Sequence, residues 1–138
     1  MIDFSTSLGQ RAHRELNEER IIWLTTVGGD GTPQTRPVWF LWENDSFLIY
    51  SQPGAYKLVH ITANARVSVH FNSDVLGNKV TVFLGDSRLD PEAPPADQHP
   101  AYLEKYKQGI ANLQMTPEGF AQSYSTAIRV TPTTLRGF

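Results

Sequence analysis

Cysteine is absent from this chain of 138 residues. Its absence excludes a disulfide framework, a thiolate nucleophile and a thiolate-bound metal, and it fits a reducing compartment. The net charge is only −2 and no basic block occurs, so the electrostatic footprint of a nucleic-acid-binding protein is missing. We therefore expect no nucleic-acid partner.

Long apolar runs are missing too. No segment approaches the roughly 20 apolar residues that a membrane-spanning helix needs, and the first 20 residues lack the apolar stretch of a signal peptide. We expect a cytoplasmic protein without membrane contact. Hydrophobic residues make up 40% and charged residues 19%, which is ordinary for a globular protein. At this length we expect residues 1–138 to form one domain.

The common catalytic and metal-binding motifs are also missing. The sequence contains no G-x-S-x-G nucleophile elbow, no phosphate-binding P-loop and no G-x-G-x-x-G dinucleotide fingerprint. The four histidines are His13, His60, His70 and His99, and no two have the close spacing that places metal ligands on one helix face. We interpret them as surface or lightly packed residues and predict no metal site.

The patterning that is present predicts a mainly β chain with appended helices. Runs rich in β-branched and aromatic residues predict about six strands, near residues 21–27, 34–42, 46–51, 65–72, 79–89 and 127–138. Helices are predicted from about residue 7 to 19, over 55–65 and 101–113, and from Thr116 onward. The strands follow one another in hairpins instead of alternating with helices, which favours an antiparallel barrel. Open sheet edges are a hazard, so the sheet is expected to close or to pair with a second chain.

The turn that leads from the third predicted strand into a helix, Ser51 to Lys57, draws attention. It brings together a serine hydroxyl, backbone N–H groups near a helix start and an ammonium group, which together suit a phosphate. A polar loop with a solvated lysine is the alternative interpretation. Trp39 and Trp42 are three apart on a predicted strand, so they cannot share a face. We expect one to face the core or a ring, and the other solvent or a partner.

Three segments in order, TTVGGDGTPQTRPVWF, FLIYSQPGAYKLVHITANARVSVHF and VFLGDSRL, resemble the pyridoxamine 5′-phosphate oxidase-like flavoproteins. The resemblance runs from about residue 21 to 89 and is nearest to the actinobacterial branch that uses the deazaflavin coenzyme F420. It implies a six-stranded antiparallel split β-barrel that forms a homodimer, with cofactor sites at the dimer interface. It also implies that the cofactor-binding residues include Arg36, Pro37, Val38, Trp39, Tyr50, Ser51, Gln52, Tyr56 and Lys57.

Within that set the resemblance implies distinct roles. The strand holding Arg36 lines the flavin-like ring, Ser51 and its neighbours lie beside the ring and its side chain, and Lys57 contacts the phosphate. Oxidases of the family commonly have serine and arginine before this lysine, but Ala55 and Tyr56 stand here. This loss of phosphate ligands favours F420, whose phosphodiester carries one charge, over FMN, whose phosphate carries nearly two.

The expected activity is that of an oxidoreductase which transfers a hydride between F420, or alternatively FMN, and a small organic substrate such as an enone or quinone-like ring. No catalytic acid is identified, and the proton could come from water, Tyr50 or Tyr56. Vitamin B6 oxidation is not expected, because the substrate-binding arginine and histidine of true pyridoxamine-phosphate oxidases find no match. A flavin, deazaflavin or haem carrier without turnover is the alternative, and a purely structural dimer is a third.

Overall fold

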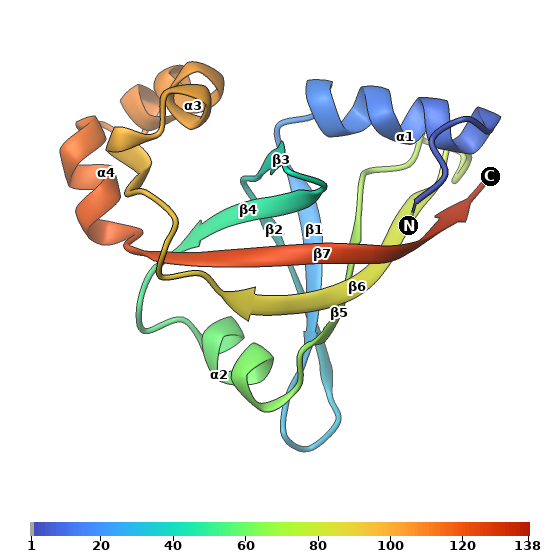
Figure 1. Ribbon diagram of the computed structural model, residues 1–138, viewed down its shortest axis with the longest axis horizontal. Helices are drawn as coiled ribbons and strands as arrows, with labels where there is room; N and C mark the ends of the chain where they lie inside the picture. The colour runs from blue at the N-terminus through green and yellow to red at the C-terminus, as the bar shows by residue number, and fades with distance from the viewer. Residues whose placement is uncertain (1) are drawn as a thin grey trace.

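A curved antiparallel sheet of seven strands forms the body of the molecule, and the computed structural model describes it over residues 2–138 (Figure 1). The strands are β1 (Ile22–Val27), β2 (Pro33–Val38), β3 (Leu41–Glu43), β4 (Ser46–Ser51), β5 (Arg66–His70), β6 (Thr81–Leu89) and β7 (Thr126–Gly137). They pair in the order β2-β1-β5-β6-β7-β4-β3. The helices are α1 (Ser7–Glu18), α2 (Tyr56–Ala63), α3 (Pro100–Asn112) and α4 (Pro117–Ser123), with a 3₁₀ turn η1 (Ala96–Gln98). The predicted class, a mainly β half-barrel with appended helices, is confirmed.

The strand count was wrong, because the single strand expected over residues 34–42 is two strands. β2 ends at Val38 and pairs with β1, whereas β3 begins at Leu41 and pairs with β4. The two therefore lie at opposite edges of the sheet. At the corner between them, the Phe40 N–H donates a 2.9 Å hydrogen bond to the hydroxyl of buried Tyr106, 66 residues away along the chain. This distant contact holds a corner that local residue preferences do not indicate.

The helices α1, α3 and α4 begin at residues that favour a helix start. The Thr6 hydroxyl accepts a 2.9 Å hydrogen bond from the Gly9 N–H at the start of α1, as an N-cap residue does. Both α3 and α4 begin with a proline, which is favoured in the first helical turn because its missing N–H has no helical partner there. No helix within residues 2–138 combines the length and the apolar character that crossing a membrane requires.

The pairing between β6 and β7 is irregular near Pro132. Pro132 stands opposite Gly85 of β6, at a point where the pairing register between the strands shifts. A side chain at Gly85 would collide with the carbonyl of Thr131, so only glycine allows the two backbones to approach this closely. The resulting irregularity accompanies the joint curvature of β6 and β7 (Figure 1).

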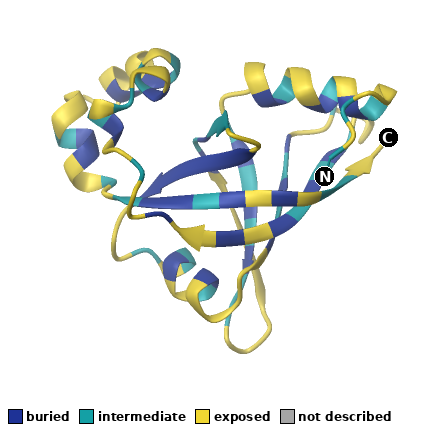
Figure 2. Cartoon of the chain, viewed as in Figure 1, coloured by how far each residue is buried: buried dark blue, intermediate teal, exposed yellow. Residues whose placement is uncertain are grey.

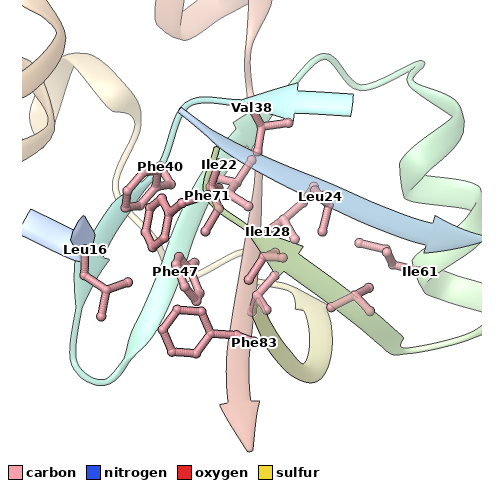
Figure 3. Close-up of a cluster of buried hydrophobic side chains, with 14 of the residues drawn as sticks. Leu16, Ile22, Leu24, Val38, Phe40, Phe47, Ile61, Phe71, Phe83 and Ile128 are labelled. Carbon is pink, nitrogen blue, oxygen red and sulfur yellow. The ribbon is translucent and has the colours of Figure 1, made fainter. Parts of the chain in front are cut away.

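β4 is buried at all six positions because it separates two hydrophobic clusters (Figure 2). Its alternate residues Phe47 and Ile49 belong to the first cluster, the barrel core, which fills the inside of the curved sheet (Figure 3). Leu48 and Tyr50 point to the other face. There they join the second cluster, the helical-lobe core, with residues of η1, α3, α4 and β7.

Candidate site for an anion and a planar ring

A pocket of about 340 Å³, the cationic pocket, lies between the β1–β2 hairpin and α2. Gln34 and Arg36 of β2 stand opposite Thr26 and Leu24 of β1, so the four side chains share one face of the sheet. α2 contributes Tyr56, Lys57 and His60 to the lining. The hairpin and the helix thus bring a guanidinium and an ammonium into one pocket.

In the part of the chain that the structure describes, these two cations have no carboxylate partner. Among residues 2–138, neither Arg36 nor Lys57 forms an ion pair. The Arg36 guanidinium donates a 3.2 Å hydrogen bond to the carbonyl of Thr35. Burial, and next the charge of Arg36, lower the pKa of the Lys57 ammonium. A bound anion would offset both the repulsion and the desolvation, so the arrangement favours an anionic ligand.

The start of α2 adds backbone donors to this pocket. Ala55 caps the helix without a side-chain hydrogen bond, and the Leu58 N–H donates to the Ala55 carbonyl at 3.1 Å. In the described part of the chain, the N–H groups of Tyr56 and Lys57 have no acceptor. Free N–H groups at a helix start are suited to phosphate oxygens. The predicted combination of helix start and ammonium group is therefore present.

A second pocket of about 270 Å³, the aromatic pocket, adjoins the first, since Pro37 and Lys57 line both. Its other lining residues are Val38, Trp39, Tyr50, Tyr102, Leu113, Phe120 and Tyr124. Trp39 stacks on Tyr106 of α3 with 4.6 Å between ring centroids and 2° between the planes. Aromatic walls suit a flat conjugated ring. Together the two pockets can hold a planar ring that carries an anionic group.

Seven of the nine residues predicted to bind a cofactor line these pockets. They are Arg36, Pro37, Val38, Trp39, Tyr50, Tyr56 and Lys57. Ser51 and Gln52 line neither pocket: Ser51 is buried, and its hydroxyl donates a 3.0 Å hydrogen bond to the Gln52 carbonyl. The Ser51 hydroxyl is therefore engaged by the backbone, and cofactor contacts by these two residues stay a prediction.

His60 is a lining residue that the sequence analysis did not assign to the site. Its Nδ1 lies 2.9 Å from the hydroxyl of Thr26, a buried residue of β1. His60 follows Lys57 by three residues, and this helical spacing, which places both on one face of α2, was the available signal. Within residues 2–138, no three His, Asp or Glu side chains are grouped as metal ligands.

The half-barrel sheet with its appended helices defines a split-barrel protein. The model of the family described as pyridoxamine 5′-phosphate oxidase matches residues 8–138, nearly the whole chain. The chain belongs to this family, which confirms the resemblance identified from the sequence. No curated protein matches the chain significantly.

Solved structures of several kinds share this fold. An F420 reductase is 23% identical with a TM-score of 0.66, over 90% of this chain and 94% of that one. A FAD-binding protein from Mesorhizobium loti is 17% identical with a TM-score of 0.67, over 91% and 90%. HutZ, the haem storage protein of Vibrio cholerae, is 14% identical with a TM-score of 0.65, over 96% and 95%. At these identities the similarity establishes a common fold and does not identify a ligand.

Proposed function

We propose that this protein is an oxidoreductase that binds a flavin-type cofactor across the two pockets and exchanges a hydride between it and a small organic substrate. The observation that carries the proposal is the pair Arg36 and Lys57, without carboxylate partners, beside an aromatic pocket. Flavins and deazaflavins combine a planar ring system with a phosphate on its side chain. The F420 reductase and the FAD-binding protein among the structural relatives support this class of cofactor.

The residues present fit such a group in their chemistry. Lys57, Arg36 and the free N–H groups of α2 would hold the phosphate, and Trp39 and Tyr50 would border the ring. The cofactor supplies the hydride chemistry when it is bound. The protein's part is to orient the ring and to keep water from it, which the apolar walls of the aromatic pocket favour.

Within this class, the proposed cofactor is F420, with FMN as the alternative. The side chain of Tyr56 is 81% exposed beside Lys57, at the position where related oxidases have arginine. The site thus offers two cationic side chains, Arg36 and Lys57. Two cations suit a diester with one negative charge better than a monoester with nearly two, because a dianion needs more partners to offset its desolvation.

The substitution Lys57→Ala tests the phosphate site. Loss of one charge-assisted contact, roughly 1.5–3 kcal/mol, should weaken cofactor binding about ten- to a hundredfold in a fluorescence titration. Lys107→Ala, which removes an exposed lysine on α3, is the matched control and should leave the affinity unchanged. If Lys57→Ala binds F420 and FMN as tightly as the wild type, the phosphate assignment is wrong.

The substitution Tyr56→Arg tests the choice of cofactor. A third cation should strengthen FMN binding more than F420 binding, because the monoester carries more charge. Titrations of the wild type and the variant with both cofactors at one ionic strength give the ratio of FMN affinity to F420 affinity for each protein. Tighter binding of FMN than of F420 by the wild type would overturn the preference but not the flavin-type site.

We also propose that the protein functions as a homodimer. Residues 33–37 of β2 are all exposed, on both faces of a strand that forms part of the sheet. Pro33 and Pro37 remove N–H donors from this edge, which disfavours extension of the sheet by another strand. A second copy packed against the faces of β2 would cover them and the mouth of the cationic pocket. Light scattering should give twice the chain mass, and a monomer mass with cofactor bound would contradict the proposal.

A haem carrier without turnover is the second candidate function. It is supported by the fold shared with HutZ and by His60, whose Nδ1 contact with Thr26 leaves Nε2 available as a ligand. A haem titration followed by the Soret band should then show a shift that His60→Ala abolishes. Consumption of reduced F420 with an added acceptor, in the absence of haem, would favour the oxidoreductase.

A further inference from the structure

A third pocket, of about 580 Å³, is larger than either pocket described so far and continues from them. Tyr50 and Tyr124 line both this pocket and the aromatic pocket. One wall is the proline-rich segment 89–95 that follows β6, and the other is the junction 124–127 between α4 and β7. The cationic, aromatic and third pockets therefore form one row, with the aromatic pocket in the middle.

The proline-rich wall is anchored at two points. The Tyr50 hydroxyl donates a 2.6 Å hydrogen bond to the carbonyl of Pro94. Asp90, which is buried, forms a 3.0 Å ion pair with Arg129 of β7. Since prolines also restrict the backbone of this segment, the pocket is formed before any ligand arrives. The ion pair also removes the charge of Asp90 as a partner for a ligand.

The polar groups that remain in this pocket are uncharged. Its apolar lining residues are Leu89, Pro91, Ala93, Pro94, Pro95, Ala121 and Ala127. Tyr50 already donates its hydrogen to Pro94, and burial raises the pKa of Tyr50 to about 12. The hydroxyl of Tyr124, by contrast, has no hydrogen-bond partner among residues 2–138 and is not buried. The hydroxyls of Ser125 and Thr126 line the third pocket alone, so Tyr124 is the available donor among the residues that line both pockets.

We propose that the third pocket binds the second reactant: a flat, mainly apolar, uncharged molecule whose carbonyl oxygen accepts a hydrogen bond from Tyr124. The apolar walls suit the body of such a molecule, and the shared position of Tyr124 places its carbonyl end next to the aromatic pocket. Its role as a reactant rests on the proposed oxidoreductase function. Binding of the molecule in the third pocket does not depend on that function, because it can be measured in the absence of cofactor.

Equilibrium dialysis of cofactor-free protein with 2-methyl-1,4-naphthoquinone tests the pocket. Ser125 lines it and is exposed, so Ser125→Trp should fold and should weaken probe binding at least tenfold by filling the space. Ser123→Trp, two residues earlier on the exposed face of α4, is the matched control and should bind like the wild type. Ala93→Leu fills the pocket from the proline-rich wall and should act like Ser125→Trp.

The hydrogen bond is tested separately. Tyr124→Phe should weaken the probe about three- to tenfold, as loss of one neutral hydrogen bond does. FMN and F420 titrations of Ser125→Trp should match the wild type. If Ser125→Trp and Ala93→Leu bind the probe as tightly as the wild type, the proposal is wrong. It is also wrong if Ser125→Trp loses as much affinity for the cofactors as for the probe, because the pocket would then be part of the cofactor site. A wild type that binds the probe but neither cofactor would instead overturn the proposed function alone.

Discussion

The barrel core and the helical-lobe core are packed on opposite faces of β4, yet they are built from different side chains. The barrel core contains phenylalanine and aliphatic residues, such as Phe47 with edge-to-face contacts to Phe40 and Phe83. The helical-lobe core instead contains tyrosines, including Tyr102 and Tyr106, both nearly inaccessible to solvent. Hydrocarbon packing has little direction, whereas a buried hydroxyl requires a partner at a defined place.

The buried hydroxyl of Tyr106 links the helical-lobe core to the candidate site. Its hydroxyl accepts the hydrogen bond of the Phe40 N–H and donates one of 2.6 Å to the carbonyl of Arg20. Its ring stacks on Trp39, a wall of the aromatic pocket. Burial raises the pKa of the Tyr106 hydroxyl, which keeps it protonated and able to donate. We therefore expect the barrel core to contribute most of the stability and the helical-lobe core to position the Trp39 wall of the aromatic pocket.

The largest expected effect is on the barrel core. Phe47→Ala removes a completely buried ring that also contacts Trp42 edge-to-face, and should lower the free energy of unfolding by about 3–5 kcal/mol. Urea denaturation followed by circular dichroism measures the change. Phe138→Ala, which truncates a ring that is 70% exposed, is the control and should change stability little. A loss below 1 kcal/mol in Phe47→Ala would mean that the barrel core is not the main source of stability.

A smaller but more informative effect is expected in the helical-lobe core. Tyr106→Phe keeps the ring but leaves the Phe40 N–H and the Arg20 carbonyl without their partner, which should cost about 1–3 kcal/mol of unfolding free energy. Because the β2–β3 corner and Trp39 depend on this contact, cofactor affinity should fall as well. Tyr56→Phe, on an exposed ring whose hydroxyl forms no hydrogen bond within residues 2–138, is the control for stability. Unchanged cofactor binding in Tyr106→Phe would mean that the helical-lobe core does not position the walls of the cofactor site.

The same contrast explains how much of the fold the sequence could predict. Alternation identified β5, whose Val67 and Val69 are buried in the barrel core, because a period of two reflects local geometry. The break between β2 and β3 was missed, since it depends on Tyr106 from a distant helix. Elements defined by hydrocarbon patterning were thus predictable, and a corner defined by one long-range hydrogen bond was not.

The residues of the candidate site also divide into those that the sequence predicted and those that it did not. Arg36 and Lys57 were found because they lie in a motif whose order and spacing resemble a known family. His60 and Tyr124 line the pockets through the packing of α2 and of the junction between α4 and β7. For His60, the spacing of three residues from Lys57 was a signal in the sequence, whereas for Tyr124 the sequence offers none. Ser51 lies within the same motif, but it is buried in β4, all of whose residues are buried, and it lines neither pocket. Position within the motif therefore identified most of the residues that line the pockets, and the packing of distant segments determines the others.

The smallest expected effect concerns Lys105, a charge placed where the two clusters meet. Its ammonium donates a 2.8 Å hydrogen bond to the Phe40 carbonyl and lies 3.7 Å from the centroid of the Phe40 ring. Burial, and then repulsion from Arg20, lower the pKa of Lys105 to about 8, against an ordinary value near 10.5. Between these two values the unfolded chain binds more protons than the folded chain. The contribution of Lys105 to stability should therefore increase as pH rises through this window and stay constant below it.

The substitution Lys105→Met isolates this contribution, because methionine keeps much of the apolar stem and cannot titrate. The free energy of unfolding of the wild type relative to Lys105→Met should rise by about 1 kcal/mol between pH 7 and pH 9.5, a value reduced by the partial exposure of the group. Lys107→Met, on the exposed face of α3, should show no such rise. Urea denaturation of the three proteins at both pH values measures the differences. A flat difference would mean that folding does not shift the pKa of Lys105, and a falling one that the Phe40 carbonyl and ring stabilise the charged form more than burial disfavours it.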